Sequence, residues 1–175
     1  KLGEKIKAIL LHSSNKVSKV SELFLYLADR REHIEEVIKP ALREGEIVIC
    51  DRFIDATVAY QGYGRGLDIP WIDKLNEIIT QGILPDITFL LDINPSLSKH
   101  RGEENDRIEK EKVAFYEKVR QGYLEIAKSY PKRIKIIKGK AKPEEIHLII
   151  RKIVLKFLKK PEIFDYPDKS PNYTV

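Results

Sequence analysis

Apolar positions along the chain follow helical spacing in some segments and form short continuous runs in others. The segment 21–42 places Leu23, Leu27, Ile34 and Ile38 four or seven residues apart, which predicts a long amphipathic helix. Pro40 is expected to kink or end this helix, because proline has no backbone N–H to donate and crowds the preceding turn. Periodicity predicts further helices over residues 2–11, 69–82 and 108–130, and from Pro143 onward.

Three short apolar runs alternate with these helices and predict β-strands. They cover residues 47–50, 86–93 and 133–139, and the first two are expected to be buried strands. Alternation of strands and helices predicts a parallel sheet with helices on both faces, which is a three-layer α/β/α fold. Residues 1–159 are expected to form one domain, and residues 160–175, with three prolines and no period, a flexible or surface-docked tail.

The composition excludes some function classes. The chain has 175 residues, 42% of them apolar, which fits a globular domain, and its net charge of +5 is spread along the sequence. Nucleic-acid binding calls for a clustered basic face, so we expect no nucleic-acid partner. No segment has the composition of a secretory signal or the apolar length needed to span a membrane. We therefore expect a cytoplasmic protein without membrane contact.

Cysteine and histidine usage argues against a structural metal site. Cys50 is the only cysteine, so no internal disulfide can form, and its place in the run 47–50 predicts a buried thiol. The four histidines are scattered, and none has a partner at zinc-ligand spacing. The sequence supports neither a Ser-His-Asp arrangement nor a covalent nucleophile.

An acid and an arginine follow directly after the first predicted strand. Asp51 and Arg52 would lie at the carboxyl end of a parallel strand, where open α/β sheets bind ligands. A carboxylate there can hold Mg²⁺, often through water, and an arginine can bind a monophosphate with two parallel hydrogen bonds. Local chemistry leaves open that Asp51 only caps a helix and that Arg52 lies on the surface.

Two further segments carry candidate chemistry. Tyr26 and Arg30 are four residues apart and share a helix face, so a ring that can stack on a base lies beside a guanidinium that can donate to it. A charged loop at about 100–108 offers Arg101 and Arg107 for the charge that develops in phosphoryl transfer. From the residues alone, a half-buried tyrosine, a solvated arginine and a solvated loop remain alternatives.

Several motifs together resemble the thymidylate kinase family, whose members phosphorylate dTMP with ATP. The segment DRFIDATVAYQGYGRG, residues 51–66, resembles the family's DR[YFH] motif and the loop that follows it. The resemblance runs from about Leu2 to about Leu158 in the family's order. Its other segments are YLADRREHIEEVIKPAL (26–42), PDITFLLDI (85–93), RGEENDRIEKE (101–111) and VRQGYLEIA (119–127).

The resemblance implies a P-loop nucleotide kinase fold and an ATP-dependent phosphotransferase. Such an enzyme transfers the γ-phosphoryl group of ATP to dTMP, giving dTDP and ADP for dTTP synthesis, with Mg²⁺ as cofactor. The resemblance also implies a homodimer that forms through the helices near Glu22 and Trp71.

The resemblance assigns roles to individual residues. Tyr26 matches an aromatic position that stacks on thymine, commonly phenylalanine in the family, and Arg30 matches an arginine that bonds the base carbonyl. Arg52 is assigned to the dTMP phosphate, and Asp51 to the metal, through water, and to the reacting centre. The remaining assignments place Thr57, Tyr60 and Gln61 in the base and sugar pocket. They place Arg101 and Arg107 in catalysis by the family's lid, the charged loop at about 100–108, with Arg107 also contacting ATP. Downstream of the lid, we expect Arg120 and Tyr123 to close over the substrate.

One feature departs from the family pattern. Proteins of this kind begin with a strand, a GxxxxGK[ST] phosphate-binding loop, a helix and a second strand, and these 175 residues contain no GxxxxGK[ST]. We expect the natural protein to carry that unit upstream and this chain alone to be inactive, since nothing else here can cradle the ATP β-phosphate. Two alternatives stay open: a related nucleotide kinase of other specificity, and a noncatalytic nucleotide-binding remnant without the ATP site.

Overall fold

The structure is a computed structural model that describes residues 2–12, 17–97, 107–108 and 111–159. The chain divides into two compact units, residues 1–137 and 138–175, and each is described by itself. The expected boundary between a domain and a tail at residue 159 stays a prediction, because residues 160–175 lie outside the described part of the chain.

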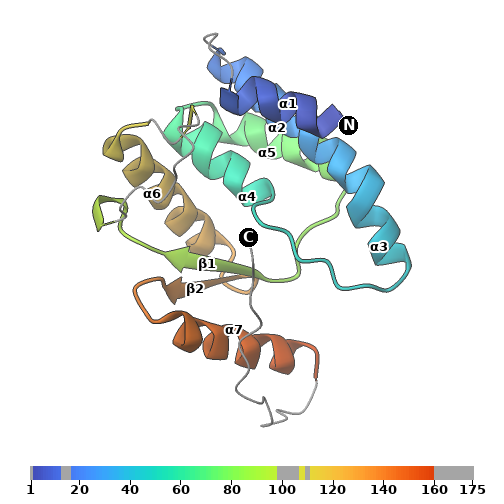
Figure 1. The fold of residues 1–175 in the computed structure, drawn as a ribbon, viewed down its shortest axis with the longest axis vertical. Coiled ribbons are helices and arrows are strands. Elements are labelled where there is room, and N and C mark those ends of the chain that lie inside the picture. The colour runs from blue at the N-terminus through green and yellow to red at the C-terminus, as the bar shows by residue number, and fades with distance from the viewer. Residues whose placement is uncertain (1, 13–16, 98–106, 109–110, 160–175) are drawn as a thin grey trace. The chain divides into compact units, whose positions relative to one another are not determined.

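The first unit is rich in helices and contains a small sheet. Figure 1 shows β1 and β2 side by side with their arrowheads at the same end, so the two strands run parallel. This arrangement confirms the α/β class. The elements are α1 (Leu2–His12), α2 (Lys19–His33), η1 (Ile34–Ile38), α3 (Lys39–Arg43), α4 (Ile54–Thr57), η2 (Val58–Gly64), α5 (Ile69–Thr80), β1 (Thr88–Asp92), η3 (Pro95–Leu97), α6 (Val113–Ser129) and β2 (Ile134–Lys138).

The long helix predicted over residues 21–42 is present, but Pro40 does not end it. The helix begins after Ser18, whose hydroxyl accepts a hydrogen bond from the backbone N–H of Ser21 at 3.1 Å. It continues through α2, η1 and α3 as far as Arg43. The turn before Pro40 is a π-helix, in which Lys39 donates to the carbonyl of Ile34 five residues back. This wider turn accommodates the proline, which a regular α-helix would not.

The strand predicted over residues 47–50 is wrong. These residues have no regular secondary structure, and Ile47 and Ile49 are 70% and 94% exposed. Cys50, expected to be buried, is half-buried. A strand exists only where a neighbouring strand takes its hydrogen bonds, and the sheet seen among the described residues contains only β1 and β2.

The other two predicted strands are present, but β1, which was expected to be buried, has no fully buried residue. Leu91 of β1 and Ile136 of β2 each remain about half exposed. The helix expected over 108–130 starts later, at Val113, because Ile108 lies in a turn and its carbonyl oxygen accepts from the Tyr116 hydroxyl at 2.8 Å.

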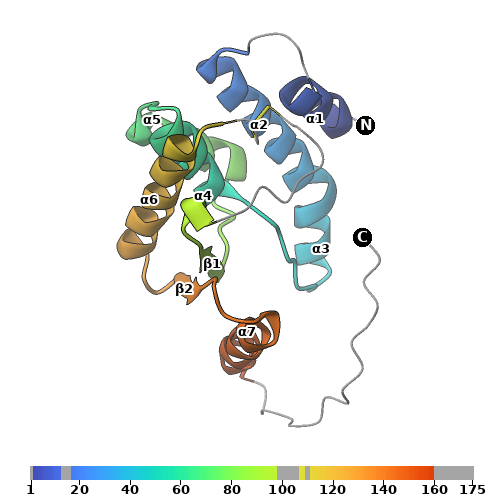
Figure 2. The ribbon, with the colours of Figure 1, turned by 60° about the vertical axis from the view of Figure 1, so that its left-hand side comes forward.

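Two glycines allow α6 and η2 to approach each other closely. A Cβ atom added at Gly122 of α6 would lie 2.6 Å from the Tyr63 ring, and one at Gly64 of η2 would lie 2.6 Å from the Phe115 ring. In Figure 2, α4 lies between α6 and α2. The close packing of α6 against η2 at these two glycines fixes the position of the η2 side chains. The core cluster here includes Leu23, Leu27, Val58, Ala59, Ile72, Phe115 and Val119.

The second unit is described through its helix α7, Pro143–Phe157. As predicted, Pro143 opens this helix, and Glu144 and Glu145 lie in its first turn, with Lys156 in its last, as the helix dipole favours. None of the helices within the described ranges is both long enough and apolar enough to cross a membrane.

Candidate functional site

A cavity of about 1020 Å³ lies in the first unit, where α1, α2 and η2 meet. It brings together most of the predicted site residues from three separate parts of the sequence. Those that line it are Tyr26, Arg30, Asp51, Arg52, Thr57, Tyr60 and Gln61. The structure therefore places the substrate helix, the DR segment and the following loop around one space of a size that suits a small ligand.

Within the described part of the chain, three predicted residues do not line this cavity: Arg107, Arg120 and Tyr123. Tyr123 lies behind it, where its ring meets the edge of the Tyr60 ring with centroids 6.4 Å apart. Burial raises the pKa of the Tyr123 phenol well above its ordinary value, so this side chain stays neutral. Arg107 faces α1 and α2, and Arg101 lies outside the described residues.

Arg30 and Thr57 form one polar wall of the cavity. The Arg30 guanidinium donates a hydrogen bond to the Thr57 hydroxyl and lies 5.8 Å from the centroid of the Phe53 ring. Burial lowers the pKa of Arg30 from its ordinary value, although a guanidinium remains protonated and can only donate. The Thr57 oxygen must therefore accept, which leaves its proton for a ligand acceptor.

Arg52 is held in an uncommon backbone conformation at the mouth of the site. Its φ of 63° lies in the left-handed region, which residues other than glycine rarely adopt without support from their surroundings. Its guanidinium lies 5.4 Å from the centroid of the Tyr60 ring, close enough for a cation–π contact. The strained backbone and the Tyr60 ring together direct a cation toward the cavity beside Asp51.

A buried carboxylate that was not predicted as a site residue lies behind Gln61, which lines the cavity. Glu22 is 1% exposed and accepts from Gln61 Nε2 at 2.9 Å, from Arg65 Nε at 3.0 Å and from Arg107 Nη2 at 2.5 Å. Burial works to raise its pKa, but the hydrogen bonds from Arg65, Gln61 and Arg107 outweigh burial and leave the pKa below its ordinary value. Glu22 therefore stays ionised. Its spacing of four residues from Tyr26 was the signal that could have revealed it.

A second buried ion pair, Asp55 with Arg133, fixes the position of α4, the helix that carries Thr57. Asp55 of α4 accepts two hydrogen bonds from Arg133, at 2.6 and 2.7 Å, and Arg133 also donates to the Thr88 hydroxyl at 3.1 Å. The pair joins α4 to the beginnings of both strands. The contact with Asp55 raises the pKa of Arg133 above its ordinary value.

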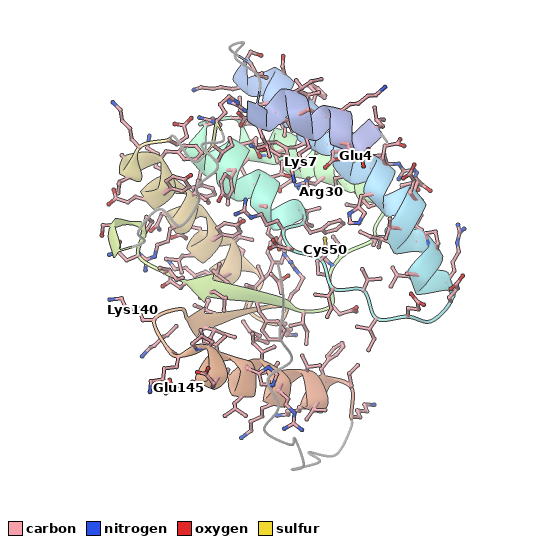
Figure 3. The ribbon with its side chains drawn as sticks, viewed as in Figure 1. Glu4, Lys7, Arg30, Cys50, Lys140 and Glu145 are labelled. Atoms are coloured by element: carbon pink, nitrogen blue, oxygen red, sulfur yellow. The ribbon has the colours of Figure 1, made fainter. Side chains whose placement is uncertain are left out.

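Helix α1, for which no role was predicted from the sequence, completes the cavity. Gly3, Glu4 and Lys7 line the cavity opposite α4, and Figure 3 shows Glu4 and Lys7 above Arg30 in that view. Lys7 adds a further basic side chain to the cavity lining. The cavity lining thus offers tyrosine rings, several cations and three acids, Glu4, Asp29 and Asp51, a combination that suits a nucleoside monophosphate. A cavity with these groups suits a nucleotide-binding protein.

Comparison with known sequences identifies the family. The family profile described as thymidylate kinase matches residues 1–150. A thymidylate kinase of Thermoanaerobacter sp. (strain X514) is 46% identical over 160 residues, which cover 90% of this chain and 79% of that protein. One from Kosmotoga olearia is 45% identical over 161 residues, which cover 90% of this chain and 77% of that protein. This chain belongs to the thymidylate kinase family.

A solved structure agrees with this assignment. The crystal structure of thymidylate kinase from Ehrlichia chaffeensis superimposes with a TM-score of 0.69 at 37% sequence identity, covering 86% of this chain and 72% of that chain. The P-loop nucleotide kinase fold expected from the sequence is thereby confirmed.

Proposed function

We propose that this protein transfers the γ-phosphoryl group of ATP to dTMP, giving dTDP and ADP. The observation that carries the proposal is the convergence of Tyr26, Arg30, Thr57 and Arg52 on one cavity in a chain of the thymidylate kinase family. An aromatic ring, donors for base carbonyls and a phosphate-binding arginine are the groups that dTMP requires.

The base is bound at the α2 side of the cavity. Tyr26 stacks on the thymine ring, and Arg30 donates to a base carbonyl, with the Thr57 proton available to a second acceptor. Gln61 contacts the base edge, and Tyr60 covers the deoxyribose where a 2′-hydroxyl would otherwise fit. This set of groups favours a pyrimidine deoxynucleotide over a purine monophosphate.

The phosphate is bound at the Arg52 side of the cavity. Arg52 holds the acceptor phosphate, and its fixed backbone aims the guanidinium before the substrate arrives. Asp51 lines the same cavity and fits a Mg²⁺ ion held through water, since Mg²⁺ is usually bound by one or two carboxylates together with substrate phosphates. When bound, Mg²⁺ neutralises charge on the phosphate oxygens. ATP is the co-substrate.

The lid arginines supply positive charge to the transferring group. Arg101 and Arg107 are the candidates, and the guanidinium of Arg107 is held by the Leu10 carbonyl oxygen at 3.1 Å and by Glu22. Tyr123 supports the pocket from behind through Tyr60. Arg120 Nε donates to Asp92 Oδ1 at 2.6 Å, so the two side chains form an ion pair.

The protein is expected to act as a cytoplasmic homodimer without nucleic-acid or membrane partners. The support for a dimer is apolar surface on neighbouring helices. Phe24 of α2 and Trp71 of α5 meet edge to face with ring centroids 5.9 Å apart, yet they remain 48% and 37% exposed. Sedimentation velocity of the protein and of a Phe24→Asp variant tests the dimer, and a wild-type monomer at micromolar concentration would contradict it.

A coupled assay for ADP release tests the proposed reaction. The protein, with Mg²⁺ and ATP, should turn over dTMP much faster than AMP or dGMP. Equal turnover of dTMP and AMP would favour a nucleotide kinase of other specificity. Binding of dTMP without any ATP turnover would favour the noncatalytic reading.

Tyr26→Ala should weaken dTMP binding by about 1–3 kcal/mol, the cost of losing one base stack. Tyr26→Phe is the matched control, because it keeps the ring and removes only the hydroxyl, and its affinity for dTMP should stay near that of the wild type. Isothermal titration of both variants with dTMP measures the effect. An unchanged affinity in Tyr26→Ala would remove the ring from base recognition.

A further inference from the structure

The buried carboxylate of Glu22 accepts four hydrogen bonds, two on each oxygen. Its Oε1 accepts from Gln61 and Arg65, and its Oε2 accepts from Arg107 and from Arg65 Nη2 at 3.2 Å. Arg65 also pairs with Glu111 and lies 4.6 Å from the centroid of the Phe115 ring. The two arginines and two glutamates balance in charge, so the carboxylate is held firmly in one orientation while almost fully buried.

The orientation of this carboxylate determines the orientation of the Gln61 amide. An ionised carboxylate can only accept, so Gln61 must present its NH₂ group to Glu22. With the NH₂ group held by Glu22, the amide oxygen is left as the acceptor that Gln61 can offer to a ligand in the cavity it lines. A glutamine without such a partner could flip and present either a donor or an acceptor.

We propose that Glu22 is a positioning residue for base selection: it holds the Gln61 amide so that an acceptor oxygen meets the base edge. The proposal rests on the proposed function, because it assumes that the cavity takes a pyrimidine monophosphate. Thymine carries an N–H at its N3 position, whereas cytosine carries a lone pair there. An acceptor oxygen favours thymine and leaves two acceptors opposed when cytosine enters.

The effect expected from one mismatched buried hydrogen bond is on the order of tenfold in affinity. Glu22→Gln replaces the carboxylate with an amide of the same shape that can also donate, so the Gln61 amide is free to flip. The ratio of dTMP affinity to dCMP affinity should fall by about tenfold. Part of the preference for dTMP over dCMP should survive, because Arg30 and Thr57 can still donate hydrogen bonds to a base carbonyl.

Isothermal titration of the full chain with dTMP and with dCMP tests the proposal. Glu22→Gln, Gln61→Ala and the double variant should all lose the same part of the preference, because Glu22 acts through Gln61. Glu111→Gln is the matched control: it removes a carboxylate from the same network without touching Gln61, so its dTMP to dCMP ratio should stay near that of the wild type. A purely structural network would move both ratios alike.

Other outcomes would overturn the proposal. An unchanged ratio in Glu22→Gln, a further loss in the double variant, or the same loss in Glu111→Gln would each contradict it. If Glu22→Gln does not fold, the double variant Glu22→Gln with Arg65→Met is measured instead, because it removes the cation that has lost its counter-charge. The same loss of the preference for dTMP over dCMP is expected.

Hydrogen exchange of the Gln61 side-chain amide in the wild-type protein tests the contact with Glu22 directly. The Gln61 side-chain NH₂ protons should exchange slowly with solvent, and rapid exchange would refute the contact with Glu22. A wild-type protein that binds no dTMP would instead refute the proposed function.

Discussion

Asp55→Ala is expected to lower the free energy of unfolding by about 3 kcal/mol, near the lower end of the range for breaking a buried ion pair. The substitution leaves the Arg133 guanidinium without its carboxylate partner at a site where both side chains are largely shielded from water. The lower end applies because Arg133 keeps some contact with solvent. Urea denaturation of the purified chain, with the midpoint and slope fitted together, measures the loss.

Two controls separate the buried charge from other causes of destabilisation. The double variant Asp55→Ala with Arg133→Met should recover part of the loss, because no uncompensated cation remains. Asp92→Ala breaks a pair with similar two-point geometry, at 2.6 and 2.9 Å to Arg120, on a more exposed surface. Its effect should be clearly smaller. Equal losses for the two pairs would show that burial does not set the cost.

The helices of this protein could be predicted because their signals are local. The apolar spacing around Leu23 and Leu27 places α2, and Pro143 with the two acids behind it places the start of α7. The absence of a strand at 47–50 could not be predicted in the same way. The apolar run there is real, but a strand needs a partner for its hydrogen bonds, and Ile49 is 94% exposed without one.

Much of the candidate site could be predicted because its residues lie in recognisable motifs. Tyr26 and Arg30 share a helix face, and Arg52 follows them in a segment that resembles the family, so their meeting at one cavity was expected. Glu22 was missed, although it lies one turn before Tyr26. A glutamate on a helix is normally solvated, and its burial here depends on Arg65 and Arg107, which lie 43 and 85 residues away in sequence.

Tertiary contacts of this kind also changed the interpretation of Arg107. The sequence placed it in a charged loop and assigned it to the transferring phosphoryl group. The structure shows its guanidinium contacting the Leu10 carbonyl oxygen and Glu22, while its backbone N–H donates to the Leu11 carbonyl oxygen at 3.1 Å. Arg107 therefore also joins the end of the lid segment to α1 and α2. Its catalytic role stays a prediction that kinetics can test.

Arg52→Ala and Arg107→Ala are expected to impair the enzyme in different ways. Arg52 holds the acceptor phosphate in both the ground state and the transition state, so its loss should raise the KM for dTMP as well as slow turnover. Arg107 is expected to act mainly on the transferring group, so its loss should lower kcat by about 10²–10⁴ with little change in the KM for dTMP. Steady-state kinetics with dTMP and ATP varied separately measure both effects.

Arg107→Lys shows which property of Arg107 turnover requires. Lysine keeps the positive charge but cannot reproduce the guanidinium contacts with Glu22 and the Leu10 carbonyl oxygen. If charge near the phosphoryl group is what counts, kcat should recover most of the loss seen in Arg107→Ala. If the contacts count, both variants should be slow, and thermal unfolding should show both to be destabilised. A near-wild-type kcat for Arg107→Ala would remove Arg107 from the mechanism and leave Arg101 as the remaining lid candidate.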